Sequence, residues 1–343
     1  MQVVRELDEA TWRCFVERQP LGNVFHSPEM FRVFSMAKGH LPELWAVLDE
    51  AGNVGALMMP VRVSIRQGAL RGLTTRSIVY GGPLCRDDDQ GRAALGVLLS
   101  GYEASVGRKS LLTEFRNLSD LSSLRSVFEA GGYVYEDHLN FLVDLDRPPE
   151  DVMQGIRTKT RKAIRKGIRD ARVMVREVTD RAEMEDWYDL LQRTYRHATV
   201  PLADRSLFDA TFDILRPVGM AKLLLARVDG APVACSAELP YKDTIFGWYG
   251  GSDRAYSRFL PNEILTWHVL EWGANSHASV YDFGGAGKPD KEYGVREFKA
   301  KFGGELVNFG RYVRVHTPVR LKASSLGYGV YQRFERLRVK ARS

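Results

Sequence analysis

The sequence contains little cysteine and no apolar stretch long enough to cross a membrane. Its three cysteines, Cys14, Cys85 and Cys235, are far apart and odd in number, so they predict neither a disulfide framework nor a CxxC site. No run of residues approaches the roughly 18 apolar positions that a membrane-spanning helix needs. Residues 1–8 also lack the apolar segment of a secretory signal. We therefore expect a soluble protein that stays in the cytoplasm.

Histidine is scarce as well, and its spacing is unlike that of a metal site. The seven histidines never stand at HxH or HxxxH spacing, so we expect no metal ion and no bound cofactor. There is no Gly-x-Ser-x-Gly motif, and no cysteine has a histidine close by in the sequence. A covalent acyl-enzyme intermediate therefore has no support from the sequence.

The charge is distributed unevenly along the chain. Residues 1–145 hold 15 Lys and Arg against 18 Asp and Glu, whereas the remainder holds 34 against 25. A basic excess confined to the second part suggests a polyanionic partner there, such as RNA, phosphates or an acidic membrane surface. An ordinary solvated basic surface explains the charge alone equally well.

Length and pattern predict two domains of mixed α/β structure. The chain has 343 residues, of which 44% are apolar, enough for two packed cores. Helix and strand patterns alternate through residues 8–145, and the same order returns after the Pro-Pro break at 148–149. We expect domains at residues 1–147 and 148–316, followed by a basic tail at 317–343. Within them, the pattern predicts one strand over 54–65 and one helix over 150–169.

The segment from residue 281 to residue 304 has the most distinctive pattern. Its Asp-Phe-Gly triplet occurs in protein kinases, but no HRD-type catalytic loop precedes it and no glycine-rich phosphate loop lies upstream, which excludes a kinase. Taken alone, the segment is a strand that ends in a glycine turn, followed by a short helix and a second turn. Its notable runs are Tyr281-Asp282-Phe283-Gly284-Gly285, Gly294-Val295-Arg296-Glu297-Phe298-Lys299 and Phe302-Gly303-Gly304.

These three runs, in this order and spacing, resemble the Fem family of non-ribosomal peptidyltransferases, which build peptide cross-bridges and related aminoacyl adducts. That family carries a Tyr-Asp-Phe strand, a glycine-rich loop, a Gly-Val/Ile-x-x-Phe-Lys helix and a Phe-Gly-Gly ending. The Tyr-Gly-Gly-Ser run at 249–252 and the basic run at 159–167 are also similar to family segments. The resemblance spans both halves of the chain, but its specific motifs lie in residues 157–304.

The resemblance implies two tandem domains of the GNAT acyltransferase type, in agreement with the repeated α/β pattern. Many Fem proteins insert a long helical arm, but this sequence has no extended charged heptad segment, so we expect a version without it. The resemblance also implies catalytic roles for two residues. Lys299 would stabilise the oxyanion that forms when a substrate amine attacks an ester carbonyl, and Phe298 would shape the pocket. The alternative is an exposed helix lysine beside a core phenylalanine.

Four residues are candidates for substrate binding. In the family, one basic residue near the N-terminus and one in the second domain clasp the phosphates of the acceptor. Arg32 and Arg196 lie in roughly comparable places, and an arginine could grip a diphosphate with two hydrogen bonds. Tyr249 resembles a pocket tyrosine, and Asp282 belongs to the Tyr-Asp-Phe strand. For either arginine taken singly an exposed side chain is the better explanation, and Tyr249 suits core packing equally well.

The absence of a glycine-containing loop bears on the identity of the acyl donor. GNAT acetyltransferases bind the pyrophosphate of acetyl-CoA with a glycine-containing loop at a helix N-terminus. At the corresponding place this chain reads Ser-Arg-Phe-Leu-Pro-Asn over residues 257–262, without glycine. We therefore expect an aminoacyl-tRNA donor. A CoA or carrier-protein thioester donor, used in polysaccharide, lipid or natural-product modification, is the alternative.

A basic helix supports an RNA partner. Eight basic residues and one acid stand within positions 157–172, opposite an apolar face. Because like charges at i, i+4 repel, such a face indicates a polyanion contact, although a solvated basic helix is the alternative. The candidate RNA-binding residues are Arg157, Arg161, Lys162, Arg165, Lys166 and Arg169.

The basic tail is a second candidate surface. Residues 311–343 contain nine Lys and Arg and a single acid, with apolar residues at helical spacing. The pattern fits an amphipathic helix on an anionic membrane or RNA, and equally a helix packed on the second domain. Contact of this helix with an anionic membrane would place the protein at the inner face of that membrane.

The sequence thus predicts a monomeric aminoacyltransferase that moves an amino acid from aminoacyl-tRNA to an amine of a peptidoglycan precursor or a similar peptide. A catalytically silent RNA- or membrane-binding protein of the same fold is a third possibility. The retained Phe298-Lys299 pair argues against it.

Overall fold

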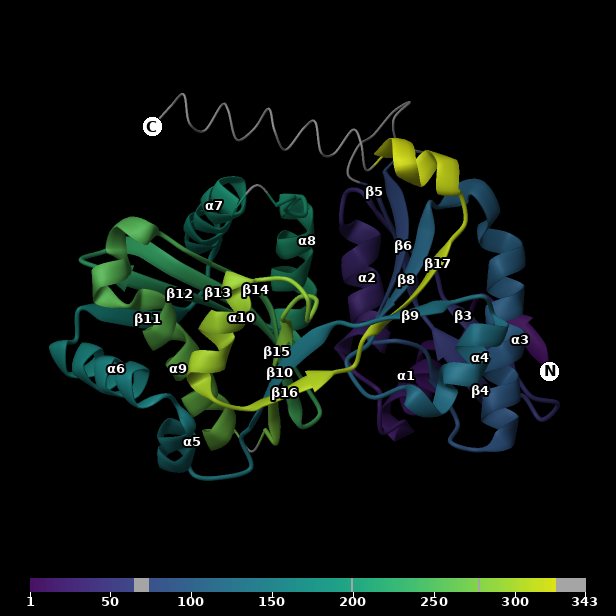
Figure 1. Cartoon of the computed structure of the whole chain (residues 1–343), viewed down its shortest axis with the longest axis horizontal. Helices are drawn as coiled ribbons and strands as arrows, with labels where there is room; N and C mark the ends of the chain where they lie inside the picture. The colour runs from purple at the N-terminus through teal and green to yellow at the C-terminus, as the bar shows by residue number, and fades with distance from the viewer. Residues whose placement is uncertain (65–73, 199, 277, 325–343) are drawn as a thin grey trace. The chain divides into compact units, whose positions relative to one another are not determined.

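The computed structural model describes residues 1–64, 74–198, 200–276 and 278–324, and the chain divides into two compact units (Figure 1). Unit 1 comprises Met1–Asp137 and the chain from Phe309 onward, and unit 2 comprises His138–Asn308. The domain boundaries predicted from the sequence, after residues 147 and 316, each lie one strand later in the chain than the observed boundaries. The predicted mixed α/β architecture is confirmed.

Unit 1 contains two sheets. The first has the order β1-β3-β4-β7 and the second the order β2-β5-β6-β8-β17-β9. The strands are β1 (Gln2–Val4), β2 (His40–Pro42), β3 (Trp45–Leu48), β4 (Val54–Met58), β5 (Pro60–Ser64), β6 (Thr75–Tyr80), β7 (Leu84–Cys85), β8 (Leu112–Arg116), β9 (Val134–Glu136) and β17 (Arg311–Val315). The prediction of a single strand over 54–65 was wrong, because Pro60 has no N–H for a continuous ladder and β4 and β5 enter different sheets.

Besides the helical residues 318–324, unit 1 has four α-helices and three short 3₁₀ helices among its described residues. They are α1 (Glu9–Arg18), η1 (Val24–His26), α2 (Pro28–Met36), α3 (Asp89–Val106), η3 (Gly107–Lys109), η4 (Ser122–Leu124) and α4 (Arg125–Ala130). The Ser27 hydroxyl accepts a hydrogen bond from Met30 N and Pro28 stands at the first helical position, as the sequence predicts for α2. Helix α3 packs its apolar side on β3 and β4, which forms the centre of this unit's core.

Unit 2 is built on one sheet with the order β11-β12-β13-β14-β15-β10-β16. The strands are β10 (Leu139–Asp144), β11 (Val173–Glu177), β12 (Lys222–Val228), β13 (Ala231–Tyr241), β14 (Thr244–Ser252), β15 (Val280–Gly285) and β16 (Glu305–Asn308). Among the described strands of unit 2, only β14 and β15 pair in parallel, and their pairing ends at Phe246 and Asp282. Beyond that point β14 follows β13 alone, while β15 continues along β10 to the glycine-rich segment.

The helices of unit 2 cover this sheet and carry the basic run. They are α5 (Pro149–Gly155), α6 (Thr158–Asp170), α7 (Arg181–Ala198), α8 (Arg205–Ala210), the π-helical turn η5 (Thr211–Leu215), η6 (Arg216–Val218), η7 (Arg254–Phe259), α9 (Pro261–Asn275), α10 (Gly294–Lys299) and η8 (Ala300–Phe302). Neither α3 nor α7, at 18 residues the longest described helices, forms an inserted arm.

The prediction of one helix over 150–169 was wrong, because the chain breaks between α5 and α6. Ile156 is buried and extended there, with ψ of 138°. Arg157 N donates to Lys301 O at 2.9 Å, and Arg161 donates to Gln154 O at 2.6 Å and Ile156 O at 3.3 Å. The arginine thus satisfies carbonyl groups that the end of α5 leaves open.

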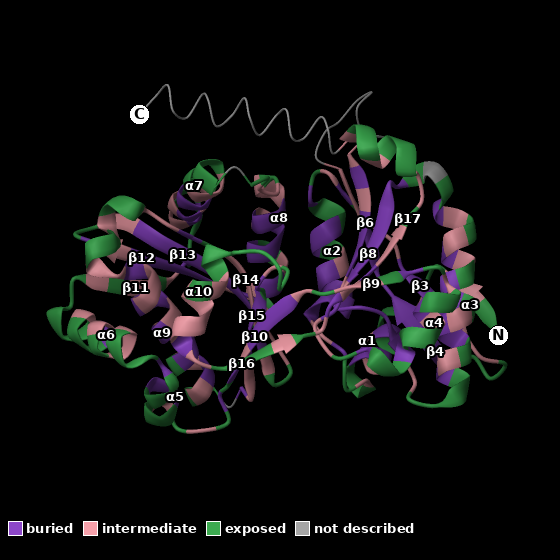
Figure 2. Ribbon diagram, in the orientation of Figure 1, coloured by how far each residue is buried: buried purple, intermediate pink, exposed green. Residues whose placement is uncertain are grey.

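The core of unit 2 lies between the sheet and helices α5, α6 and α9. It contains side chains from β10, β12 and β15 as well as these helices, and Figure 2 shows their buried positions beside the exposed outer face of α6. Among the described residues, no helix is both long and apolar enough to cross a membrane. Residues 318–324 of the basic tail are helical, and the rest of that tail lies outside the described part of the chain.

Candidate functional site

The glycine-rich end of β15 is tied to α10 by the ammonium group of Lys299. Its Nζ donates hydrogen bonds to the carbonyl oxygens of Phe283, Gly284 and Gly285, at 2.6, 3.1 and 2.9 Å. An ammonium group has three donors, and all three are therefore used. The bond to Gly285 is the exposed one of the three, so it is the contact that an incoming ligand oxygen can replace most easily.

A buried carboxylate lies beside this ammonium group. Asp282 is 3% exposed and accepts a hydrogen bond from Gly284 N at 2.7 Å. The Asn140 Nδ2 donates to both carboxylate oxygens of Asp282, at 3.3 and 3.4 Å. Asn140 belongs to β10, which pairs with β15. Strands β10 and β15 and helix α10 thus converge on one polar cluster in an otherwise apolar region.

Burial shifts both charged groups toward their neutral forms. It lowers the pKa of Lys299 to about 8, and the Asp282 carboxylate opposes that shift. Burial likewise raises the pKa of Asp282 to about 6, against the effects of the Gly284 N–H and of Lys299. Perturbed pKa values of this kind are typical of reactive sites. Here they belong to Lys299, the predicted catalytic residue, and to the neighbouring Asp282.

Phe298 lies next to Lys299 but faces the core. It is half-buried against the apolar cluster of unit 2, with its ring centroid 5.3 Å from that of Phe302. Lys301 Nζ stands 5.2 Å from the Phe298 ring centroid and 3.1 Å from Glu263 Oε1. Phe298 therefore anchors α10, so that Lys299 reaches the carbonyl groups from a fixed direction.

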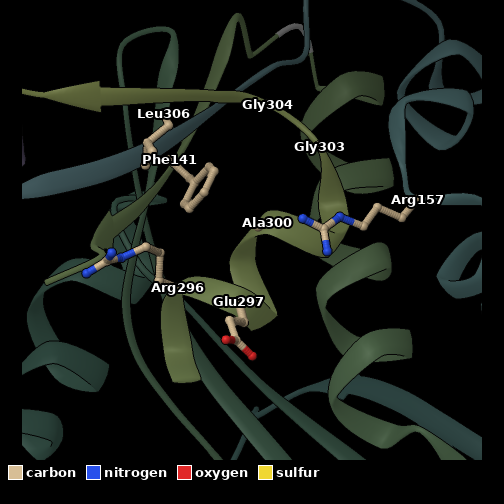
Figure 3. A pocket seen from close by; sticks show the side chains of 8 residues that line it. All are labelled: Phe141, Arg157, Arg296, Glu297, Ala300, Gly303, Gly304 and Leu306. Atoms are coloured by element: carbon tan, nitrogen blue, oxygen red, sulfur yellow. The ribbon is translucent and has the colours of Figure 1, made fainter. Parts of the chain in front are cut away.

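A groove of about 630 Å³ lies on another side of α10 (Figure 3). Its lining consists of Phe141, Arg157, Arg296, Glu297, Ala300, Gly303, Gly304 and Leu306. The Phe141 ring and the Arg157 guanidinium point into it from opposite sides (Figure 3). The Arg157 side chain has no hydrogen-bond or ion-pair partner among the described residues, so the groove combines an apolar wall with an available cation.

A second buried polar pair crosses the sheet where β14 and β15 part. The Tyr281 hydroxyl donates to Glu238 Oε2 at 3.1 Å, reaching from β15 to β13 across the intervening strand. Gly247 on β14 allows this, because a Cβ there would lie 2.5 Å from the Tyr281 hydroxyl. Glu238 is 2% exposed, and burial raises its pKa to about 7.

The basic run of α6 divides into two groups. Arg161 closes the end of α5, and Arg165 forms an ion pair with Glu150, so both are used within the protein. Lys162, Lys166 and Arg169 are exposed and have no ion pair or hydrogen bond among the described residues, and Lys159 is exposed in the same way. The predicted contact of this helix with a polyanion stays a prediction; these four side chains, with Arg157 at the start of the helix, are the ones not engaged within the described part of the protein.

The remaining candidates lie in separate surroundings. Arg32 is in unit 1 and forms ion pairs with Glu9 and Glu29 at 3.3 and 3.2 Å. Arg196 is exposed on α7 and donates to Gln192 at 3.0 Å. Tyr249 is half-buried among aromatic rings, with centroid distances of 4.9 Å to Phe208 and 5.0 Å to Trp248. These placements leave their predicted contacts with substrate as proposals.

Several residues at the site gave no signal in the sequence. Asn140 and Glu238 lie in ordinary strand patterns, and only the pairing of distant strands brings them to Asp282 and Tyr281. Arg296 stands at a variable position of the Gly-Val-x-x-Phe-Lys pattern. Among the described residues, no three metal-binding side chains come together.

Comparisons with known proteins agree with this geometry. A family model described as an acetyltransferase (GNAT) domain matches residues 154–299, which contain α6, the β14–β15 pair and α10. The lipid II:glycine glycyltransferase of Staphylococcus haemolyticus (strain JCSC1435) is 27% identical over 129 residues. That match covers 35% of this chain and 31% of the relative, so the chain spans about a third of the curated relative's length.

Solved structures match over almost the whole chain. A crystal structure of FemX has a TM-score of 0.72 and 16% identity, covering 94% of this chain and 100% of its own. L-PGS from Bacillus licheniformis has a TM-score of 0.58 and 14% identity, with coverages of 95% and 99%. A tandem GNAT protein of clavulanic acid biosynthesis has a TM-score of 0.58 and 13% identity, with coverages of 92% and 99%. The predicted GNAT-type fold and the resemblance to the Fem family are confirmed.

The buried Glu238 makes stability depend on pH. The pKa of Glu238 is about 7 in the folded protein and has its ordinary value of 4.5 in the unfolded chain, so the folded state binds more protons between these values. The stabilising contribution is complete below pH 4.5 and is lost as pH rises through 7. We expect Glu238→Gln to remove a decline on the order of 3 kcal/mol, measured by urea unfolding from pH 4.5 to 8.

Tyr281→Phe is the matched control for this prediction. It removes the hydroxyl that lowers the pKa of Glu238 but leaves the carboxyl group in place, so the decline with pH should persist. An unchanged slope in Glu238→Gln would contradict the assignment.

Proposed function

Because this chain is a Fem-like protein built on the GNAT-type fold, we propose that it transfers an amino acid from aminoacyl-tRNA to an amine of a peptidoglycan precursor or a similar peptide. The observation that carries the proposal is the Lys299 ammonium held at the end of β15 by three carbonyl oxygens. The name of the staphylococcal relative, a lipid II:glycine glycyltransferase, supports a lipid-linked precursor as acceptor. Such an acceptor would bring the protein to the inner face of the membrane.

The proposed reaction is direct attack by the acceptor amine on the ester carbonyl of the donor. The carbon–nitrogen bond forms, the ester carbon–oxygen bond breaks, and the amine proton leaves with the released hydroxyl group of the tRNA. Negative charge develops on the carbonyl oxygen, and Lys299 stabilises it once that oxygen replaces the exposed Gly285 carbonyl as an acceptor. Phe298 fixes the helix from which Lys299 acts.

The start of α9 supports a donor other than acetyl-CoA. Pro261 occupies the first helical position and has no N–H, and Leu260 before it has φ of +56°. Leu260 N donates to Ser257 O within η7 at 3.0 Å, so it is not directed at a ligand. This terminus therefore offers fewer free amides to a pyrophosphate than a glycine loop would.

The exposed cations of α6 support a tRNA donor. Lys159, Lys162, Lys166 and Arg169 lie on one helix without acidic partners, and Arg157 continues this surface into the groove. A helix of 13 residues is about 20 Å long, which matches a short stretch of nucleic-acid backbone. Together these residues can bind phosphates without reading a base sequence.

A transfer assay tests the proposal. The protein is incubated with a pool of radiolabelled aminoacyl-tRNAs and a muropeptide precursor, and label on the precursor is measured with and without prior RNase treatment. Transfer that RNase abolishes is the expected result. Consumption of acyl-CoA or acyl-carrier thioesters in place of aminoacyl-tRNA would contradict the proposed donor and favour the N-acyltransferase alternative.

We expect Lys299→Ala to lower kcat by about 100- to 1,000-fold, the usual effect of removing one donor to an oxyanion. Lys242→Ala is the control, because it removes the same charge from an exposed turn between β13 and β14. Its kcat should stay within about threefold of the wild type. Equal activity of the two variants would remove Lys299 from the mechanism.

We expect the double variant Lys162→Ala/Lys166→Ala to bind tRNA about tenfold more weakly near 0.1 M salt, with a smaller dependence on salt. The double variant Arg18→Ala/Lys109→Ala loses two exposed charges from unit 1 and should bind like the wild type. Fluorescence anisotropy over a salt series measures both. Equal losses in the two variants would indicate an effect of net charge alone.

A further inference from the structure

The Arg296 side chain holds the glycine-rich loop that follows β15. Its Nε donates to Ala286 O at 2.9 Å, its Nη1 to Pro289 O at 3.4 Å, and its Nη2 to Lys291 O at 2.8 Å and to Lys288 O. One guanidinium group thus binds four carbonyl oxygens of residues 286–291. Charged hydrogen bonds to backbone groups are among the stronger ones that a protein makes.

Lys299 stands one turn later on the same helix and binds the preceding carbonyl groups, at 283–285. Residues at i and i+3 lie on one face of a helix, so the two cations of α10 face the loop together. Together, Arg296 and Lys299 donate seven hydrogen bonds to backbone oxygens between Phe283 and Lys291. The two side chains therefore hold the end of β15 and the following loop against α10, from residue 283 to residue 291.

Gly287 lets the loop close over the guanidinium group. Its φ is +80°, in the left-handed region that favours glycine. A Cβ at this position would lie 3.0 Å from Tyr293 Cδ1 and 3.5 Å from Arg296 Nη2. The loop thus has its observed path because position 287 carries no side chain where Tyr293 and Arg296 meet it.

The Gly-Val-x-x-Phe-Lys pattern leaves position 296 open, so Arg296 is a feature of this chain and not of the motif. Lysine would offer one ammonium group on an unbranched stem, which cannot span the four carbonyl groups that the planar guanidinium reaches. A neutral residue would leave those groups to water, and the loop would then be held mainly by the backbone hydrogen bonds of Ala286 and Gly287 with Leu139.

We propose that Arg296 is a positioning residue of the transfer site, which holds the loop 286–291 against α10 and thereby keeps the end of β15 in a fixed position beside the Lys299 ammonium. This role rests on the proposed function, because the substrate oxygen replaces Gly285 at Lys299. Arg296 itself makes no contact with the reacting atoms. Fixing these groups before the substrate arrives is what orients a catalytic group at low cost during the reaction.

The test compares Arg296→Ala and Arg296→Lys with the control Arg254→Ala, which removes an exposed arginine of η7 without a partner among the described residues. Transfer kinetics give kcat and KM for both substrates. Cleavage by endoproteinase Glu-C after Glu292 reports whether the loop is held in the full-length protein. Thermal melting confirms that each variant is folded.

We expect Arg296→Ala to lower kcat by about 10- to 100-fold, with both KM values within about threefold, since positioning acts on the transition state. Glu-C cleavage after Glu292 should become at least about tenfold faster. Arg296→Lys should recover only part of both effects, and Arg254→Ala should match the wild type. Partial recovery separates the shape of the guanidinium group from its charge.

Two results would overturn the proposal. One is an unchanged kcat in Arg296→Ala despite faster cleavage, which would make the clamp purely structural. The other is slow cleavage in every variant, which would show that the loop does not depend on Arg296. A wild-type protein without transfer activity, combined with faster cleavage in Arg296→Ala, would refute the proposed function while supporting the clamp.

Discussion

The arrangement of the site depends on one half-buried ammonium group whose three donors are all hydrogen-bonded. Moving a charged amine out of water is costly unless its donors find partners and an opposite charge lies near. Lys299 meets both conditions through three carbonyl oxygens at the end of β15 and through Asp282. Asp282 is held in turn by Asn140 from β10 and by Gly284 N. The positions of β10, β15 and α10 are thus linked by a polar network whose Asp282 end is buried and whose Gly285 end is exposed.

The same network explains why a common fold can carry a particular chemistry. L-PGS and the tandem GNAT protein of clavulanic acid biosynthesis match this chain with the same TM-score of 0.58, so the fold alone selects neither donor nor acceptor. In the proposed reaction, this selection rests on local features: a proline at the start of α9, exposed cations on α6, and the cations of α10. Each of these lies at the edge of the sheet or on its covering helices, where substitutions leave the core intact.

Much of the fold and part of the site could be predicted from the sequence, and the failures have physical causes. Helices α2 and α9 begin at Pro28 and Pro261, and proline at the first helical position is a signal that local sequence carries. The break between α5 and α6 was missed because its stabilising contact, Arg157 N to Lys301 O, joins residues that are distant in sequence. Local periodicity also cannot show that Arg161 and Arg165 bind α5 groups while Lys162 and Lys166 stay exposed. Glu238 was overlooked for the same reason, since its partner Tyr281 lies two strands away.

The most direct test of the account is the pKa of the Lys299 amine in the intact protein. Competitive labelling with a trace acylating reagent over pH 6–11, followed by mass spectrometry, yields the titration of each lysine separately. We expect a pKa of about 8 for Lys299, and a still lower one in Asp282→Asn, because the carboxylate that favours the charged form is then missing. A value near that of exposed lysines, about 10.4, with no response to Asp282→Asn, would contradict the buried network on which the proposed chemistry depends.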